Sequence, residues 1–289
     1  MSEGTAPEAV TVMRSQDDSA KYLWRLGDGH TVESVYLALM NRGAEGPSMC
    51  ISSQVGCAVC CTFCATGRDG LMRNLTVDEI TGQVHPILAD LDTLPSAFDV
   101  SFMGMGEPLH NLAAVMVAIE ELHATYSPQC AIHFSLSTVG VARKLYELAE
   151  IDIPVSVQVS LHGPTDEIRA RLVPTKTRIP IAELLAAARH YAEVKNDVVD
   201  INYLLFDGLN DTTDCAITLT ELIGGDRRFR LKLSHYNPIA GSALNPTSET
   251  KKQRFQALCD DHGLSTFSWE SMGRDIAGGC GQLRSADQG

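Results

Sequence analysis

From residue 56 to residue 262 the chain alternates short apolar runs with amphipathic runs, and this alternation constrains the fold most strongly. Ala97 to Met103 is typical of a strand, and Ala113 to Tyr126 has the spacing of a helix. About six such strand–helix units follow one another, which favours a parallel sheet with helices outside. We therefore expect an α/β fold, a partial (β/α)6 TIM-like barrel. Before it, period-two alternation around the Gly27-Asp28-Gly29 turn predicts a short β-hairpin extension over 21–40.

The sequence predicts one domain. No linker or internal repeat divides it, so we expect a single unit over 21–289 with the barrel core at about 50–270. Residues 1–20 are polar, small and weakly patterned, which predicts a flexible tail. Glycines surround Cys280 in Gly278-Gly279-Cys280-Gly281 and predict a mobile cysteine loop over 273–284.

Cys57, Cys61 and Cys64 have C-x3-C-x2-C spacing within one short segment. Three thiolates at this spacing can bind three corners of a cubane [4Fe–4S] cluster and leave the fourth iron without a protein ligand. An open iron can bind a small molecule through an amine and a carboxylate. In radical S-adenosylmethionine (SAM) enzymes that molecule is SAM. A zinc knuckle is the alternative, although its next potential ligand, His85, lies 21 residues further on. Three-cysteine zinc sites with a remote ligand exist, so both alternatives stay open here.

Polar and glycine-rich runs follow the predicted strands, at the barrel end where reactive groups collect. The glycines of 104–108 (GMGEP) permit close approach of backbone to a ligand, and the Glu107 carboxylate can pair with the α-ammonium of SAM. Each polar side chain that ends another predicted strand can be an ordinary helix-cap or turn residue. Their common position at one end of the predicted barrel favours a shared ligand-binding rim. The expected cofactor site consists of Gly106, Glu107, Ser137, Ser160, Leu161, His162 and Asn237.

Two further cysteines are candidates for thiol chemistry. Cys280 stands among three glycines, which suits a thiolate that must reach two partners. Cys50 precedes the C-x3-C-x2-C motif by seven residues and is the second candidate. The remaining cysteines fit small, buried hydrophobic positions: Cys60, Cys130, Cys215 and Cys259.

The composition limits the compartment and the partners. The chain has no secretory signal and no apolar run of the roughly 18–20 residues that a membrane span needs, so we expect a cytoplasmic protein with no membrane partner. Nine cysteines in such a chain indicate metal or redox chemistry rather than structural disulfides. The net charge of −13 argues mildly against a large RNA partner, because phosphate neutralisation supplies much of that affinity. Basic clusters at 169–178 and 227–232 can still form a local groove.

Taken together, these segments resemble the RlmN/Cfr family of radical SAM RNA methyltransferases over roughly residues 20–284. The family methylates a ring carbon of adenosine, C2 or C8, and the resemblance implies a [4Fe–4S] cluster and two SAM molecules per turnover as cofactors. The matching stretches are 50–57 (CISSQVGC), Cys61-x-x-Cys64, 73–75 (RNL), 103–109 (MGMGEPL), 160–162 (SLH), 207–211 (DGLND), 236–238 (YNP), 273–276 (GRDI) and 280–283 (CGQL).

The resemblance also implies a role for each candidate residue. One SAM methylates Cys280, and a second SAM, held by the cofactor site, is cleaved to an adenosyl radical that takes a hydrogen atom from the S-methyl group. The thiomethylene radical adds to the substrate ring, and the adduct loses an electron and a proton, for which Glu33 is the base. Cys50 then attacks the Cys280 sulfur, which releases the product and leaves a Cys50–Cys280 disulfide. An electron donor such as flavodoxin or ferredoxin and a thiol reductant are the implied partners.

The chain departs from the family pattern where the acceptor is recognised. Family members carry a small helical RNA-binding domain before the barrel, where only about 20 residues stand here. After Pro174 the sequence reads TKTRIP instead of an asparagine-containing basic segment that ends in an aromatic residue. We therefore expect an adenine-containing small molecule or nucleotide as acceptor, with ribosomal or transfer RNA as the alternative.

Two readings outside methyl transfer stay open. A diverged radical SAM enzyme that does not methylate would need neither Cys50 nor Cys280, so the presence of both argues against it. A zinc- or cluster-bearing RNA-binding module is the other alternative, and the net charge of −13 weakens it.

Overall fold

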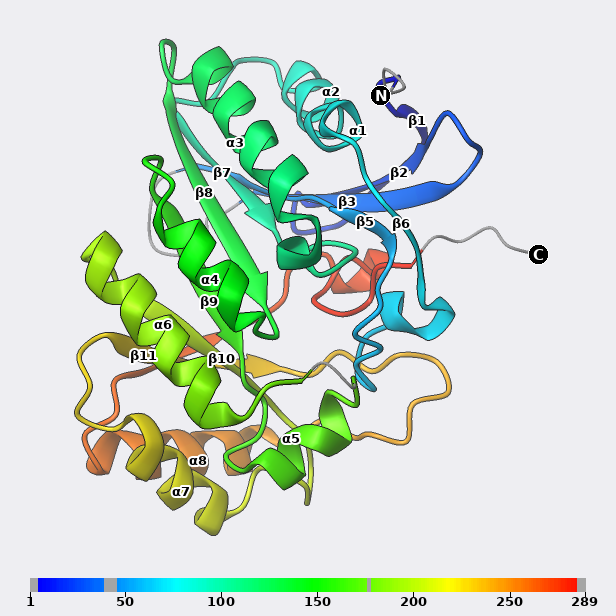
Figure 1. The fold of residues 1–289 in the computed structure, drawn as a ribbon. Coiled ribbons are helices and arrows are strands. Elements are labelled where there is room, and N and C mark those ends of the chain that lie inside the picture. Colours follow the sequence, from blue (N-terminus) through cyan, green and yellow to red (C-terminus); the bar gives the residue numbers. More distant parts are fainter. Residues whose placement is uncertain (1–4, 39–45, 176–177, 285–289) are drawn as a thin grey trace.

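The computed structural model describes residues 5–38, 46–175 and 178–284 (Figure 1). The strands are β1 (Glu8–Arg14), β2 (Ala20–Arg25), β3 (Thr31–Leu37), β4 (Ser48–Cys50), β5 (Gln54–Gly56), β6 (Leu71–Asn74), β7 (Ala97–Phe102), β8 (Ala131–Thr138), β9 (Val155–Ser160), β10 (Val199–Leu205), β11 (Phe229–His235) and β12 (Thr266–Trp269). The helices are α1 (Val77–Thr81), α2 (Val84–Ala89), α3 (Leu112–Tyr126), α4 (Ala142–Ala149), α5 (Asp166–Leu172), α6 (Ile181–Lys195), α7 (Thr213–Ile223) and α8 (Glu249–Asp261), with 3-10 turns η1 (Thr66–Asp69), η2 (Pro108–Asn111) and η3 (Arg274–Ile276). None of the helices within these ranges is long and apolar enough to cross a membrane.

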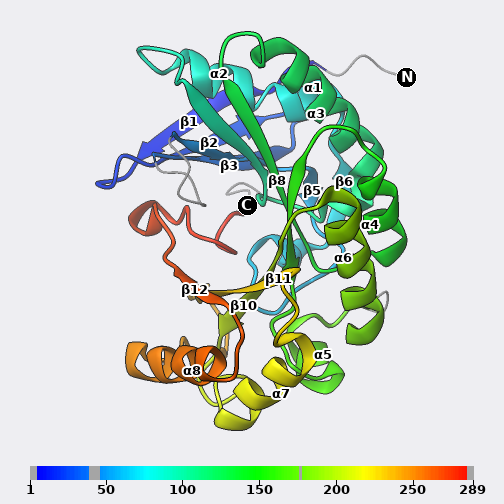
Figure 2. The same ribbon diagram turned by 90° about the vertical axis from the view of Figure 1, so that its left-hand side faces the viewer.

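Ten strands form one sheet in the order β1-β2-β3-β4-β7-β8-β9-β10-β11-β12. The pairs from β1 to β4 are antiparallel, and every pair from β4 to β12 is parallel. Helical crossovers such as α3 and α4 connect successive parallel strands. The expected α/β fold with a partial barrel is confirmed, and within the described ranges no ladder joins β12 back to β1. Figure 2 shows the sheet curving around the C-terminal segment, with the helices on its outer side.

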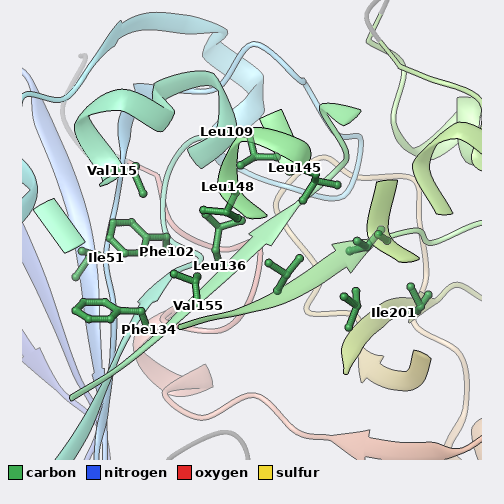
Figure 3. Close-up of a cluster of buried hydrophobic side chains, with 14 of the residues drawn as sticks. Ile51, Phe102, Leu109, Val115, Phe134, Leu136, Leu145, Leu148, Val155 and Ile201 are labelled. Carbon is green, nitrogen blue, oxygen red and sulfur yellow. The ribbon is translucent and has the colours of Figure 1, made fainter. Parts of the chain in front are cut away.

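The hydrophobic core lies between the sheet and these helices. In β8, Phe134 and Leu136 are buried in this core with Leu145 and Leu148 of α4 (Figure 3). Full burial of such a side chain stabilises the fold by roughly 1.5–3 kcal/mol. Because side chains alternate across a strand, the polar positions of β8 face the other way, into the concave side of the sheet. The fold therefore has an apolar outer interface and a concave face left for polar groups.

The predicted β-hairpin is present as β2 and β3, which pair antiparallel from Ala20↔Tyr36 to Arg25↔Thr31. Its last predicted residues, 39 and 40, lie outside the described ranges, as do residues 176 and 177 of the TKTRIP segment. The prediction of a flexible tail over 1–20 is wrong for residues 8–14, which form β1 along β2. Val10 and Val12 favour extended backbone, and the ladder satisfies its polar groups. Beyond β1, Asp17 Oδ2 accepts a hydrogen bond from Gly273 N at 2.7 Å.

The segment that carries the three cysteines is closed by a small two-stranded sheet. β5 and β6 pair antiparallel and bracket residues 57–70. A capping box then starts α1, as the Thr-x-x-Glu spacing of Thr76 and Glu79 indicates: Thr76 Oγ1 accepts from Glu79 N at 3.2 Å and Glu79 Oε2 accepts from Thr76 N at 2.9 Å. Fully buried Gln83 accepts from Ser52 N at 2.9 Å and donates to Ser52 O at 3.0 Å. These contacts fix both ends of the cysteine segment against the sheet.

Candidate active site

Cys57, Cys61 and Cys64 line one partly open cavity, which we call the three-cysteine cavity. Its wall is completed by Glu107 and by polar residues of the concave sheet face. Cys57 N donates to Gly70 O at 2.8 Å, and Cys64 N donates to Cys61 O at 3.1 Å, which shapes the turn. Phe63 and Val59 between the cysteines pack into a second apolar cluster with Phe206 and Tyr236. The apolar members of the motif therefore hold the segment down while its thiols face the cavity.

The thiols of Cys57 and Cys61 are held in their neutral form. Burial, the Glu107 carboxylate and neighbouring thiols raise the pKa of Cys57 to about 12, and burial and neighbouring thiols raise the pKa of Cys61 well above its usual value. Among the residues that the structure describes, no three His, Cys, Asp or Glu side chains gather around a single-ion position. Cys60 differs from its neighbours: the prediction that it is buried is wrong, because it is exposed, with a φ of 55°.

Glu107 is the carboxylate of the three-cysteine cavity and is 3% exposed. Its Oε1 accepts from Leu109 N at 3.1 Å and its Oε2 accepts from Val139 N at 2.9 Å. Burial raises its pKa to about 7. Gly106 also lines the cavity. A glycine is needed there for two reasons: its φ is 108°, and an added Cβ would stand 2.7 Å from the Gln54 Cβ. Gln54 Oε1 in turn accepts from Glu107 N at 2.8 Å and aims the carboxylate.

Ser137, Ser160 and His162 line the same cavity, as the sequence predicts. The two serine hydroxyl oxygens are 3.1 Å apart. His162 has a φ of 57°, and its Nδ1 accepts from Leu204 N at 3.1 Å, so a neutral ring carries its proton on Nε2. Burial and the nearby Arg169 charge lower its pKa to about 3. His162 is therefore neutral at physiological pH and presents a donor rather than a charge.

Two predicted cofactor residues lie elsewhere. Leu161 is fully buried in the hydrophobic core rather than on the rim, because it points to the opposite side of the strand end from Ser160 and His162. Asn237 is not part of the cavity wall; its Nδ2 donates to Ser271 Oγ at 2.8 Å and to Cys280 O at 3.3 Å. Asn237 Oδ1 is buried and has no hydrogen-bond partner within the described part of the chain. A buried amide oxygen of this kind can accept from a ligand donor.

Cys280 borders two cavities. It lines the three-cysteine cavity and also a second cavity with Cys50, Met103 and Trp269, which we call the Cys50 cavity. Burial and the Cys280 thiol raise the pKa of Cys50, which is consistent with close approach of the two sulfurs. Both are free thiols in this structure. The two cysteines that the sequence singles out thus meet, although one precedes the barrel and the other follows it.

The loop that carries Cys280 is anchored on its C-terminal side. Ala65 N donates to Gly281 O at 2.7 Å, and Thr66 Oγ1 donates to Leu283 O at 2.7 Å. Cys280 itself is exposed. The mobility of this loop stays a prediction.

Glu33 is buried rather than a surface residue of its strand, with an exposure of 3%. Its Oε1 lies 3.1 Å from Lys21 Nζ, and its Oε2 accepts from Arg284 N at 2.9 Å. Burial raises its pKa. Glu33 lines neither cavity in this structure, so it lies behind the C-terminal loop rather than against the space where an acceptor would stand.

The sequence analysis missed five polar residues of the cavity wall. These are Thr138, Gln158, Asn202, Lys232 and Ser234. They lie within the strands rather than after them, and Ser234 Oγ donates to Asn202 Oδ1 at 3.0 Å. A polar residue at every second position of β9, β10 and β11 is the signal that could have revealed all but Thr138.

Comparisons with known proteins agree with this architecture. A model of the Radical SAM superfamily matches residues 51–215. The crystal structure of a radical SAM methyltransferase from Sphaerobacter thermophilus superposes with a TM-score of 0.88 at 32% identity, covering 97% of this chain and 82% of that chain. The dual-specificity RNA methyltransferase RlmN of Syntrophotalea carbinolica is 38% identical over 96% of this chain and 72% of its own length. A probable RlmN of Frankia alni is 40% identical over 93% of this chain and 65% of its own length.

The fold and the three-cysteine cavity define a radical SAM enzyme. The chain belongs to the radical SAM superfamily and, within it, to the RlmN family of methyltransferases. It is therefore a radical SAM methyltransferase whose cofactors are a [4Fe–4S] cluster and SAM. The donor set fits these groups, because three thiols surround a cavity that also offers a buried carboxylate to an ammonium group.

Proposed function

We propose that this enzyme transfers a methyl group through Cys280 to a ring carbon of an adenine in RNA, ribosomal or transfer. The position of Cys280 carries the proposal, because its thiol borders both the three-cysteine cavity and the Cys50 cavity. The sequence departures from the family pattern favour a small molecule or nucleotide as acceptor. The relatives named above are RNA methyltransferases, and they support RNA instead. The net charge of −13 then implies that contacts with RNA are local rather than spread over the surface.

The cofactor roles follow from the donor chemistry. Cys57, Cys61 and Cys64 would hold the cluster, and Glu107 would pair with the SAM ammonium. When bound, the cluster supplies an electron that splits SAM and generates a 5′-deoxyadenosyl radical. Ser137, Ser160 and the neutral His162 offer hydroxyl and N–H groups to the rest of SAM. The nearly complete burial of Glu107 and His162 would keep water away from this end of the cavity.

Cys280 acts as methyl carrier in two stages. Its thiolate first displaces the methyl group from one SAM and becomes an S-methyl cysteine. That S-methyl group then loses a hydrogen atom, which the 5′-deoxyadenosyl radical would take, and its carbon bonds to the ring carbon. The ring radical gives up one electron, which the bound cluster would accept, and one proton, which restores the aromatic system. Glu33 is the base that the family resemblance suggests; reaching the ring would require displacement of its contact with Arg284 N.

Cys50 completes the turnover. Its thiolate attacks Cys280 Sγ, the bond between this sulfur and the methylene carbon breaks, and the electron pair stays with the carbon, which takes up a proton. The product is a methylated base and a Cys50–Cys280 disulfide. The disulfide takes two electrons from a thiol reductant, and a flavodoxin or ferredoxin supplies the single electrons. The shared cavity wall of the two cysteines supports this exchange.

The test is anaerobic methyl transfer from methyl-labelled SAM to a large-subunit ribosomal RNA fragment, a tRNA transcript and free adenine nucleotides in parallel. We expect label in RNA with the wild-type protein and none with Cys280→Ala. Label in the nucleotides alone would refute the RNA acceptor. Persistent transfer by Cys280→Ala would refute the covalent route.

A further inference from the structure

Lys232 is a buried cation on the concave face of the sheet. It lies in the middle of β11, is 2% exposed and lines the three-cysteine cavity. Its Nζ donates to Gln158 Oε1 at 3.2 Å and stands 4.9 Å from the centroid of the Trp269 ring. Ammonium groups are rarely buried so fully in proteins. Neither the cluster site nor the SAM site that the sequence predicts requires this lysine. The ammonium also offers three donors and no acceptor, so it selects for acceptor atoms on a ligand.

Trp269 connects this cation to the other cavity. It belongs to β12, is half-buried and lines the Cys50 cavity together with Cys50 and Cys280. Because Lys232 Nζ stands over the Trp269 ring and Trp269 lines the Cys50 cavity, the ammonium lies toward that cavity. An indole wall next to an ammonium group is thus placed where the methyl carrier and the resolving thiol meet.

Resting on the proposed function, we propose that Lys232 and Trp269 form the binding subsite for the acceptor base. Trp269 stacks on the planar ring, and Lys232 donates a hydrogen bond to a nitrogen of that ring. Stacking on an aromatic side chain suits a base that has left its own stack, because every base has a π-face. Enzymes that modify a base must first bring it out of the helix, so such a platform is required somewhere near Cys280.

The donor from Lys232 also suits the chemistry. When a carbon-centred radical adds to a ring carbon, electron density moves onto the neighbouring ring nitrogens. A fixed positive donor at one of these nitrogens is stabilising where that density develops. Lys232 is therefore expected to affect the rate of ring addition, whereas Trp269 is expected to affect acceptor binding. SAM also carries acceptor atoms, its carboxylate oxygens and its adenine nitrogens, and Lys232 lines the same cavity as Glu107, so the test below measures SAM binding and Cys280 loading separately from the acceptor step.

The test separates the acceptor step from the loading of Cys280. Cys280 methylation is measured first by intact mass without RNA, for wild type, Trp269→Leu, Trp269→Phe, Lys232→Met and Lys232→Arg, with Lys144→Met on the outer helix α4 as the control. Absence of this methylation in the wild type would refute the proposed function itself. Kinetics with the ribosomal RNA fragment follow, after melting curves establish that each variant folds.

The subsite predicts distinct kinetic effects. We expect Trp269→Leu to raise KM for the RNA about tenfold and Trp269→Phe to retain most of the affinity. Lys232→Met should lower kcat about 10- to 100-fold, with partial recovery in Lys232→Arg. Loss of SAM binding or of Cys280 methylation in the Lys232 variants would overturn the proposal, because it would assign Lys232 to SAM. Accumulation of a covalent RNA–protein adduct in Lys232→Met would also overturn it, because it would assign Lys232 to the Cys50 thiolate.

Discussion

The side-chain amide of Asn237 donates a hydrogen bond to the backbone carbonyl of Cys280 at 3.3 Å, and this contact joins the segment after β11 to the loop that carries Cys280. The same Nδ2 reaches Ser271 Oγ at 2.8 Å. An added Cβ on Gly279 would stand 2.8 Å from Asn237 Nδ2, so the loop is fitted around this one side chain. Asn237 is thus positioned to hold Cys280 between the two cavities.

Replacement of Asn237 by alanine should therefore misplace the thiol. We expect Asn237→Ala to slow Cys280 methylation by about 100-fold, the cost typical of a small misplacement of a reacting group. The exposed Asn245→Ala is the matched control. Intact-mass time courses with SAM measure the loading rate, and an unchanged rate in Asn237→Ala would contradict the positioning role.

Removal of Cys50 should stop the reaction after the ring has bonded to Cys280. The proposed exchange needs a second thiol, and Cys50 is the one that shares a cavity with Cys280. With Cys50→Ala we expect an RNA–protein adduct that survives denaturing electrophoresis, and no release of methylated RNA in the absence of small thiols. The exposed Cys60→Ala serves as control, because its thiol lines neither cavity. Normal product release by Cys50→Ala would show that another group resolves the adduct.

The sequence predicts the order of elements well, because strand and helix periodicities are local. The capping box at Thr76 and Glu79 and the cysteine segment are local patterns of the same kind, and the structure contains both. The strand β1 was missed because its seven residues are all exposed. An edge strand without a buried face has no alternation to detect, and its partner β2 decides its conformation.

The site was predicted less completely, for a physical reason. Residues after a strand are easy to find, and Glu107, Ser160 and His162 were found that way. Lys232 lies inside its strand, where a side chain normally faces a packed core. Here the sheet curves, so its concave face lines a cavity instead, and the sequence does not show this curvature. Leu161 shows the reverse error, since proximity in sequence to His162 does not give it the same face. The contact of Asn237 with the Cys280 loop joins residues 43 positions apart, and no local pattern encodes it.

Gly106 should be sensitive to any side chain. Its φ is 108°, and an added Cβ would lie 2.7 Å from the Gln54 Cβ. We expect Gly106→Ala to destabilise the protein by roughly 2–4 kcal/mol, combining backbone strain with displacement of Gln54. Gly225→Ala is the control, since Gly225 also has positive φ, 73°, but nothing lies within 4 Å of its would-be Cβ. Its cost should be about 1 kcal/mol. Equal melting temperatures for the two variants would contradict the packing argument.

His162 should make the stability of the fold depend on pH. Its pKa is lowered from 6.5 to about 3 by burial and by Arg169, so the unfolded chain binds the proton first as the pH falls. The contribution of the neutral ring is fully present above about pH 6.5 and declines below it, by up to about 1.4 kcal/mol per pH unit. In His162→Asn, an amide oxygen can replace Nδ1 as acceptor for Leu204 N, and asparagine tolerates the φ of 57°. Melting curves of the anaerobic protein at pH 7.0 and 5.5 should show a larger loss of Tm in wild type than in His162→Asn, by roughly 2–4 °C. An equal loss in both proteins would mean that His162 is not the group that titrates.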